Sequence, residues 1–287
     1  MLIGGHVSPA GGLPNAHARG VERGCDAIQV FHQNPRAWRP TNHREGDLAR
    51  FRELMADGPI RAFLIHAVYL INCASRDPEI SRKSGISLAH ALRLGDATGA
   101  DGVVLHPGSQ AGEPLEECLP RIADCVRAAL AESERCSLLL ENTAGMQGTI
   151  GRSFAELADL IERAGGDERL GVCLDCCHLL ASGFDVRDAD GLEHVVDDCD
   201  RELGLERLRC LHVNDSKVGI GANRDLHANL PEGELGREGL SAFLSEPRFE
   251  GLPAVLEVPG PEGRGPDASQ IEIARELRAE GLAARSA

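Results

Sequence analysis

Eight short apolar runs, separated by longer segments of helical spacing, are the feature of this sequence that most constrains its fold. The runs cover residues 2–8, 27–34, 62–67, 102–108, 137–145, 171–178, 209–215 and 253–260. Between them, segments such as 85–100 and 115–133 carry apolar residues with helical spacing. Apolar strands that alternate with helices are typical of a buried parallel sheet. Eight such units predict an α/β fold, one (β/α)₈ TIM barrel over residues 1–287 with a closing helix or tail after about residue 265.

Each apolar run ends at or near a residue that can bind a metal. These residues are His6, His32, His66, His106, Glu141, Asp175, His212 and Glu257. In this fold the carboxyl ends of the strands form one face, which carries the active site. Burying so many titratable groups around one cavity is costly unless a cation compensates them. The sequence therefore predicts a metal site on this face, most suited to Zn²⁺, with Mn²⁺ or Fe²⁺ as alternatives.

A late loop, "NRDLHANLPEGELG" (223–236), offers further ligands. Asp225 and His227 are two residues apart, so an extended segment would place both side chains on one face. Taken alone, the segment could be a solvated polar loop. Beside the other candidates it favours more than one metal ion.

Charge and cysteine content narrow the alternatives. The formal net charge of -15 argues against a broad basic surface for nucleic acid, so any DNA binding must be local. The acids could serve solubility, or some of them could bind metal. The ten cysteines are too scattered for a disulfide scaffold, and we expect them to be core thiols in a cytoplasmic protein with no membrane segment. Cys173 and Cys176 spell C-x-x-C, but Cys173 lies inside an apolar run, which disfavours redox chemistry.

Six motifs, in this order along the chain, resemble the endonuclease IV family, the zinc-dependent abasic-site DNA endonucleases. They are "GGHVSPAGG" (4–12), "HPGS" (106–109), "ENTAG" (141–145), "CLDCCH" (173–178), "HVNDSK" (212–217) and "RDLH" (224–227). The resemblance implies a TIM barrel with three zinc ions. It assigns His66, His106 and Glu141 to the first ion, Glu141, Asp175, His212 and Glu257 to the second, and His178, Asp225 and His227 to the third.

The same resemblance implies a reaction and a substrate. A hydroxide held between metals would attack the phosphodiester 5′ to an abasic site and leave a 3′-hydroxyl, with Glu141 as the bridging, catalytic carboxylate. The partner would be double-stranded DNA containing abasic sites, and we expect a monomer. Four ligand carboxylates facing three Zn²⁺ would leave the pocket positive by about two charges, despite the acidic chain.

Two loops are the candidate DNA contacts. By resemblance, Arg36 and Trp38 after the second run, and Tyr69 and Leu70 after the third, would reach the DNA, and Arg36, Tyr69 and Leu70 would fill the gap at the lesion. Alternatively, Trp38 and Tyr69 could anchor their loops onto the barrel.

Four positions depart from the family pattern. Leu226, Pro231, Pro35 and Ala67 differ from the residues that the family would place there, which puts details of DNA contact in doubt but removes no ligand.

Two other functions compete with the nuclease. A xylose-isomerase-like sugar isomerase or epimerase would need about four ligands and would leave the remaining candidates unexplained. A non-catalytic lesion-binding protein should have lost a ligand, and none is lost.

Overall fold

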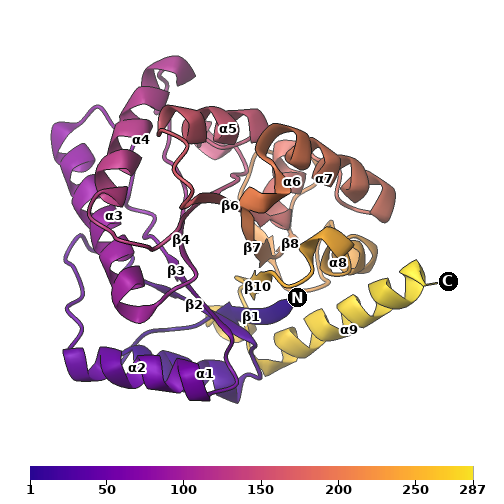
Figure 1. Ribbon diagram of the computed structural model, residues 1–287. Helices are drawn as coiled ribbons and strands as arrows, with labels where there is room; N and C mark the ends of the chain where they lie inside the picture. Colours follow the sequence, from indigo (N-terminus) through magenta and orange to yellow (C-terminus); the bar gives the residue numbers. More distant parts are fainter. Residues whose placement is uncertain (287) are drawn as a thin grey trace.

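The computed structural model describes residues 1–286 and contains a closed barrel of eight parallel strands (Figure 1), which confirms the predicted fold. The barrel order is β1-β10-β7-β6-β5-β4-β3-β2, and β1 also pairs with β2 to close it. Its strands are β1 (Leu2–His6), β2 (Ala27–Phe31), β3 (Ala62–His66), β4 (Gly102–Leu105), β5 (Leu138–Glu141), β6 (Leu170–Asp175), β7 (Leu208–Val213) and β10 (Pro253–Leu256).

Helices surround the strands on the outside of the barrel (Figure 1). They are α1 (Leu13–Glu22), α2 (Glu45–Asp57), α3 (Pro78–Thr98), α4 (Leu115–Leu130), α5 (Phe154–Arg163), α6 (Cys176–Ser182), α7 (Ala189–Leu203), α8 (Gly236–Leu244) and α9 (Ala268–Arg285). Short 3₁₀ turns lie at Met146–Gly148, Leu205–Arg207, Pro247–Phe249 and Pro261–Gly263. Helix α9 packs against α8 and β1. Within residues 1–286, no helix is both long and apolar enough to span a membrane.

Side chains that alternate along the strands build two cores. The larger core lies between the strands and the helices, and a smaller cluster fills the barrel interior. The interior cluster consists of Ala27, Ala62, Leu64, Val104, Leu139, Cys173, Cys210 and Val255. Because side chains of a strand repeat on one face every two residues, the next inward position on each strand lies directly above this apolar floor. Those positions hold Gln29, His66, His106, Glu141, Asp175, His212 and Glu257.

The segment 171–178, one apolar run in the sequence, divides into a strand and the start of a helix. Strand β6 ends at Asp175 and α6 begins at Cys176, so His178 lies in the first turn of a helix. The Asp175 carboxylate caps this helix by accepting a hydrogen bond from the His178 backbone N–H at 2.8 Å. A small antiparallel pair, β8 (Asp215–Ser216) with β9 (His227–Ala228), was also not predicted.

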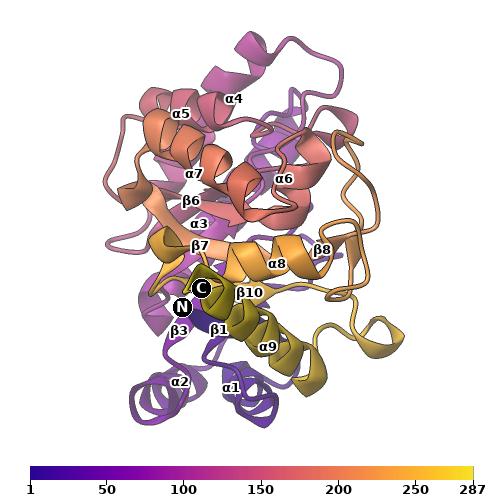
Figure 2. The ribbon, with the colours of Figure 1, turned by 90° about the vertical axis from the view of Figure 1, so that its right-hand side faces the viewer.

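Figure 2 shows the loops that follow β7 and β10, in orange and yellow, on one side of the molecule around β8. These loops leave the carboxyl ends of the strands and therefore surround the polar face of the barrel.

The contact between β1 and β2 yields a stability prediction. Gly4 lies opposite Ala27, and a Cβ at position 4 would come within 1.6 Å of the Ala27 carbonyl oxygen. We expect Gly4→Ala to lower the free energy of unfolding by about 3 kcal/mol or more, because the obstacle is backbone that cannot move aside. Urea unfolding followed by circular dichroism measures the change.

The matched control is Gly85→Ala in the interior of α3, where nothing lies within 4 Å of the added Cβ. This variant should be as stable as the unaltered chain or more stable by about 0.5–1 kcal/mol. A Gly4→Ala protein with unchanged stability would contradict the pairing of β1 with β2.

Candidate metal centre

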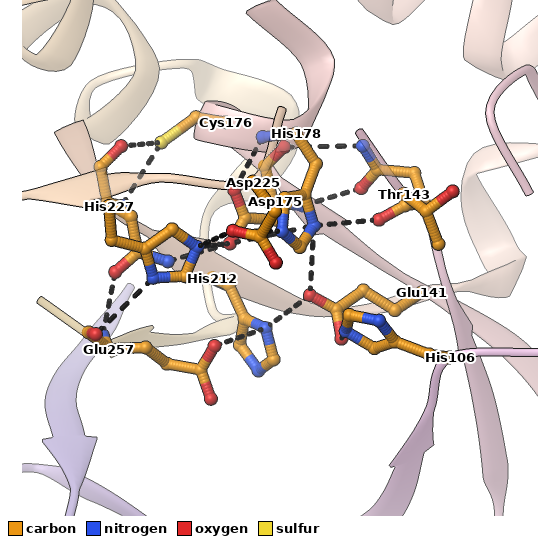
Figure 3. Close-up of polar contacts among 12 residues, drawn as sticks. His106, Glu141, Thr143, Asp175, Cys176, His178, His212, Asp225, His227 and Glu257 are labelled. Carbon is orange, nitrogen blue, oxygen red and sulfur yellow. Dashed lines mark hydrogen bonds and ion pairs between the residues drawn. The ribbon is translucent and has the colours of Figure 1, made fainter. Parts of the chain in front are cut away.

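Nine predicted ligands gather at the carboxyl ends of the strands, within the loops of that face. Each makes at least one contact of 4.0 Å or less between a side-chain nitrogen and oxygen with another member. The nine are His66, His106, Glu141, Asp175, His178, His212, Asp225, His227 and Glu257. Figure 3 shows eight of them pointing toward one another. The structure therefore brings together the whole predicted set.

Glu141, fully buried at the end of β5, joins two groups of this cluster. Its Oε2 lies 3.3 Å from His66 Nε2 and 2.9 Å from His106 Nε2. Its Oε1 lies 2.8 Å from His212 Nδ1, which is in turn 3.4 Å from Glu257 Oε2. Figure 3 shows the His212 ring between the two carboxylates. One carboxylate thus presents its two oxygens to two separate sets of donors.

The third group lies around Asp225. Its Oδ1 is 3.3 Å from His178 Nε2 and 3.1 Å from His227 Nε2. Helix α6 supplies His178, and the loop between β8 and β9 supplies Asp225, so the two unpredicted elements position this group. Asp175 Oδ2 lies 3.7 Å from His227 Nε2 and 4.0 Å from His178 Nδ1, which places this carboxylate next to the third group.

Four of the histidines are oriented through one ring nitrogen by an acceptor other than the ligand side chains, and in His178 this nitrogen, Nδ1, also lies 3.4 Å from Glu141 Oε1. His66 Nδ1 donates to the Ala67 carbonyl at 2.7 Å, and His178 Nδ1 donates to the Asn142 carbonyl at 2.9 Å. His227 Nδ1 lies 3.4 Å from the Glu257 carbonyl, and His212 Nε2 lies 3.0 Å from Gln29 Oε1. Metal-binding histidines are commonly fixed in this way, because the outer bond leaves the other nitrogen free as a ligand.

Two buried asparagines, which the sequence reading did not single out, hold Asp175. Asn142 Oδ1 accepts from the Asp175 backbone N–H at 2.6 Å, and Asn214 Nδ2 donates to Asp175 Oδ2 at 2.7 Å. Asn214 Oδ1 also accepts from the Glu257 backbone N–H at 2.9 Å. Asn142 follows Glu141 directly and Asn214 comes two residues after His212, so their closeness to ligands was the available signal.

The unpaired atoms of the cluster are those a metal would need. Among the described residues, His66 Nε2, Glu141 Oε2, His178 Nε2 and His227 Nε2 are buried without a hydrogen-bond partner. Leaving buried polar atoms unpaired is costly, and natural proteins seldom do so without a ligand. Five donor sets among the described residues lie close enough to hold an ion, and two of them include cysteine. The three sets made only of imidazoles and carboxylates are His66, Glu141, His212 and Glu257; His106, Glu141 and His178; and His178, Asp225 and His227. These imidazole and carboxylate donors fit divalent metal ions.

The charges inside the cluster support the same fit. Burial alone would raise the pKa of the Glu141 carboxyl, but the imidazoles of His212 and His106 hold this pKa well below its usual range. Burial likewise opposes ionisation of Glu257, and His212 keeps the pKa of that carboxyl low. Both carboxylates are therefore ionised at neutral pH and available as anionic donors.

The cysteines beside the cluster are different. Burial raises the pKa of the Cys176 thiol well above its usual value and raises the pKa of the Cys177 thiol to about 12. Cys177 Sγ lies close to donors of Asp175 and His227, so geometry alone would admit it as a ligand. Zinc binds the thiolate, and so high a pKa disfavours that form without metal. We interpret both as protonated core residues, as the sequence predicted.

Comparison with known proteins gives the family. Residues 18–280 match the model of the xylose isomerase-like TIM barrel. The probable endonuclease 4 of Halothermothrix orenii is 37% identical over 276 residues, which cover 96% of this chain and 99% of that protein. The crystal structure of endonuclease IV from Thermus thermophilus matches with a TM-score of 0.85 and 36% identity, covering 98% of this chain and 100% of that chain.

The chain belongs to the endonuclease IV family. A D-tagatose 3-epimerase-like protein also matches, with a TM-score of 0.69 over all of both chains, but at 17% identity it shares the fold alone. The resemblance found in the six motifs is thus confirmed over nearly the whole chain.

Two of the predicted strand-end residues lie outside the ligand cluster. His32 follows β2, and its Nε2 lies 3.0 Å from Ser87 Oγ, away from the other donors. His6 lies nearer, with Nδ1 3.4 Å from Glu257 Oε1. The inward residue of β2 is instead Gln29, which is fully buried and contacts His212 and Glu257. Gln29 was not predicted as part of the site because this residue lies inside the apolar run rather than at its end.

Of the four predicted DNA-contact residues, Tyr69 alone lines a cleft of about 910 Å³, whose lining also includes the ligands His227 and Glu257. Tyr69 lines this cleft with 55% of its surface exposed, and its ring centre lies 5.1 Å from that of His66. Arg36 is exposed, whereas Leu70 and Trp38 are half-buried and pack against the core. Lys83 Nζ lies 6.0 Å from the Trp38 ring centre. The packing of Trp38 favours the alternative in which it anchors its loop.

The four departures from the family pattern lie around the centre without replacing a ligand. Ala67 is buried, and its carbonyl accepts the bond from His66 described above. The Leu226 carbonyl accepts a hydrogen bond from the Lys217 backbone N–H at 2.8 Å. Pro35 lines the cleft, and Pro231 follows a cis peptide bond after Leu230.

Thiol and imidazole ligands can be distinguished by substitution. We expect Cys177→Ala to keep the metal content of the unaltered chain, because the protonated thiol contributes no ligand. His178→Ala, one residue along the same buried turn, should lose about one ion per chain because it removes an imidazole that belongs to two donor sets. Elemental analysis after dialysis measures both. Loss of metal from Cys177→Ala with retention in His178→Ala would assign the chemistry to sulfur.

Proposed function

We propose that this chain is a DNA-repair endonuclease that hydrolyses the phosphodiester 5′ to abasic sites in double-stranded DNA and leaves a 3′-hydroxyl, with three zinc ions as cofactors. The observation that carries the proposal is the contiguous cluster of nine imidazole and carboxylate donors in a member of the endonuclease IV family. We further propose that the protein acts as a cytoplasmic monomer.

The contacts support a division of the nine donors among three ions. His66 and His106 meet Glu141 Oε2, which fits a first ion. His212 Nδ1 lies 2.8 Å from Glu141 Oε1 and 3.4 Å from Glu257 Oε2, which fits a second ion, and the family resemblance adds Asp175 to it. His178, Asp225 and His227 fit a third. Zinc accepts all of these donors, and Mn²⁺ or Fe²⁺ would suit one site equally well.

Bound divalent ions would supply a nucleophile at neutral pH, by lowering the pKa of water, and would neutralise charge on the phosphate oxygens. The side chains of the protein prepare this chemistry. Glu141 presents one oxygen to each of two donor groups and is held between imidazoles. The hydrogen bonds to Ala67, Asn142 and Gln29 fix which imidazole nitrogen faces the centre.

The charge of the centre explains how an acidic chain can accept a polyanion. Four of the nine ligands are carboxylates, so three divalent ions would leave the centre positive by about two charges. The cleft also has Arg44 and Arg264 on its lining. Attraction would thus be concentrated where the phosphodiester must bind.

A sugar epimerase shares the barrel but explains less of this chain. One divalent ion with about four ligands would use His212, Glu141, Glu257 and one neighbour. It would leave the separate group of His178, Asp225 and His227 without a role. The number of gathered donors therefore favours the nuclease.

Cleavage of a duplex oligonucleotide with one abasic analogue, beside an undamaged duplex, tests the proposed reaction. We expect Glu141→Gln to lower the cleavage rate by at least about 100-fold while binding of abasic duplex is largely kept, because the amide retains the shape but loses the bridging charge. Rates come from gel analysis of the product with its 3′-hydroxyl, and affinities come from fluorescence anisotropy.

The matched control is Glu246→Gln, the same change at a buried carboxylate that pairs with Arg248 and Arg285 far from the centre. This variant should lose stability but cleave at the normal rate. If Glu141→Gln cleaved as fast as Glu246→Gln, Glu141 would not be catalytic.

Substitution of Tyr69, which lines the cleft, together with its neighbour Leu70 tests lesion recognition. The double change Tyr69→Ala and Leu70→Ala should weaken binding to abasic duplex by roughly 1–3 kcal/mol, the scale of lost stacking, with unchanged metal content. Val21→Ala, at an exposed apolar residue of α1, is the control and should bind normally. Equal losses for abasic and intact duplex, or loss of zinc, would instead make Tyr69 and Leu70 structural supports.

A further inference from the structure

Gln29 is a buried amide in the middle of β2, and it touches three titratable side chains. Its Oε1 lies 3.0 Å from His212 Nε2, and its Nε2 donates to Glu257 Oε1 at 2.7 Å. The same Nε2 lies 3.2 Å from His6 Nδ1. The contacts among the ligands use neither His212 Nε2 nor Glu257 Oε1, because they join His212 Nδ1 to Glu141 Oε1 and to Glu257 Oε2.

The register of the barrel explains why Gln29 reaches this position. It comes two residues after Ala27 of the interior apolar cluster, as His66 does after Leu64, and His212 after Cys210. Since inward positions repeat every two residues, Gln29 is the contribution of β2 to the layer that holds the ligands. In that layer β2 thus carries an amide, a weaker metal ligand than an imidazole or carboxylate.

We propose that Gln29 is a positioning residue for one half of the metal centre: it holds His212 and Glu257 so that His212 Nδ1 faces both Glu141 Oε1 and Glu257 Oε2. This inference rests on the proposed function and deepens it. Gln29 acts on the ligands of the second ion through their outer atoms and touches no substrate.

The chemistry of the amide matches its two main neighbours. The His212 ring has to donate through Nε2 if Nδ1 is to serve as the ligand, so it needs an acceptor, which Gln29 Oε1 provides. The Glu257 carboxylate needs a donor at its outer oxygen, which Gln29 Nε2 provides. Rotating the amide by half a turn would set donor against donor and acceptor against acceptor. A single side chain therefore fixes two ligands at once.

His212 differs here from three other histidines of the centre. The outer nitrogens of His66, His178 and His227 face backbone carbonyls, which no substitution removes. The outer nitrogen of His212 faces a side chain. The support of His212 can therefore be removed without changing any ligand.

The experiment compares the unaltered chain with Gln29→Met, which keeps the length of the side chain but neither hydrogen bond. Each zinc-loaded protein is titrated with a competing chelator, and zinc content is measured by elemental analysis. We expect about three ions in the unaltered chain, and in Gln29→Met we expect one of the three to bind about 10–100-fold more weakly while the other two are unchanged. The control is Val30→Ala on the same strand, which belongs to the outer core and should lose stability without any change in zinc affinity.

A second measurement needs no variant. In zinc-loaded protein labelled with ¹⁵N-histidine, long-range proton-nitrogen spectra should show His212 coordinated through Nδ1, with a proton on Nε2. Coordination of His212 through Nε2 would overturn the inference. An unaltered chain that holds no zinc would overturn the proposed function and this inference with it. Normal loading of the unaltered chain, with equal affinities in Gln29→Met, would overturn this inference alone.

Discussion

The buried carboxylate of Glu141 is the interaction on which the rest of the site depends. Four imidazoles, those of His66, His106, His178 and His212, lie within 3.4 Å of its oxygens. A fully buried carboxylate costs several kcal/mol unless partners compensate it, and a partly satisfied one is worse than none. His66 Nε2 and His106 Nε2 lie near Glu141 Oε2, but no hydrogen bond within the described residues satisfies this oxygen, which fits a place for a cation among these donors.

The barrel provides this arrangement through its two-residue repeat. Apolar residues such as Leu139 fill the barrel interior. The next inward residue of the same strand, Glu141, lies above this apolar layer, at the carboxyl end of the barrel. The strands can therefore supply one rigid layer of donors, and they hold most of the first two groups. The third group needs His178 and Asp225, which come from a helix and a loop, so its geometry depends on local capping by Asp175 and on the pairing of β8 with β9.

The sequence predicted much of this because the strands are continuous apolar runs that end in polar residues such as His66 and Glu141. It could not place His178 on a helix, because the start of that helix depends on a hydrogen bond that the His178 backbone N–H donates to Asp175, a carboxylate predicted only as a ligand. The prediction for the second strand was His32, whereas the inward residue that follows Ala27 two positions later is Gln29. Looking only at run ends hid a polar residue inside the run. The strands β8 and β9 have two residues each, which is too short to leave a periodic signal in the sequence.

An acidic surface and a DNA substrate are compatible because salt screens the surface charges before they reach the DNA in the cleft. At physiological ionic strength, charges on exposed surfaces act over about 8 Å, so the net charge of -15 does not reach across the molecule. A phosphodiester in the cleft meets the local field of the centre, where buried charges are screened least. Such a protein gains little from non-specific attraction along intact DNA. The proposed preference for a lesion would then come from contacts that only the lesion permits, and the exposed ring of Tyr69, 5.3 Å from that of His106, lies where the cleft meets the ligands.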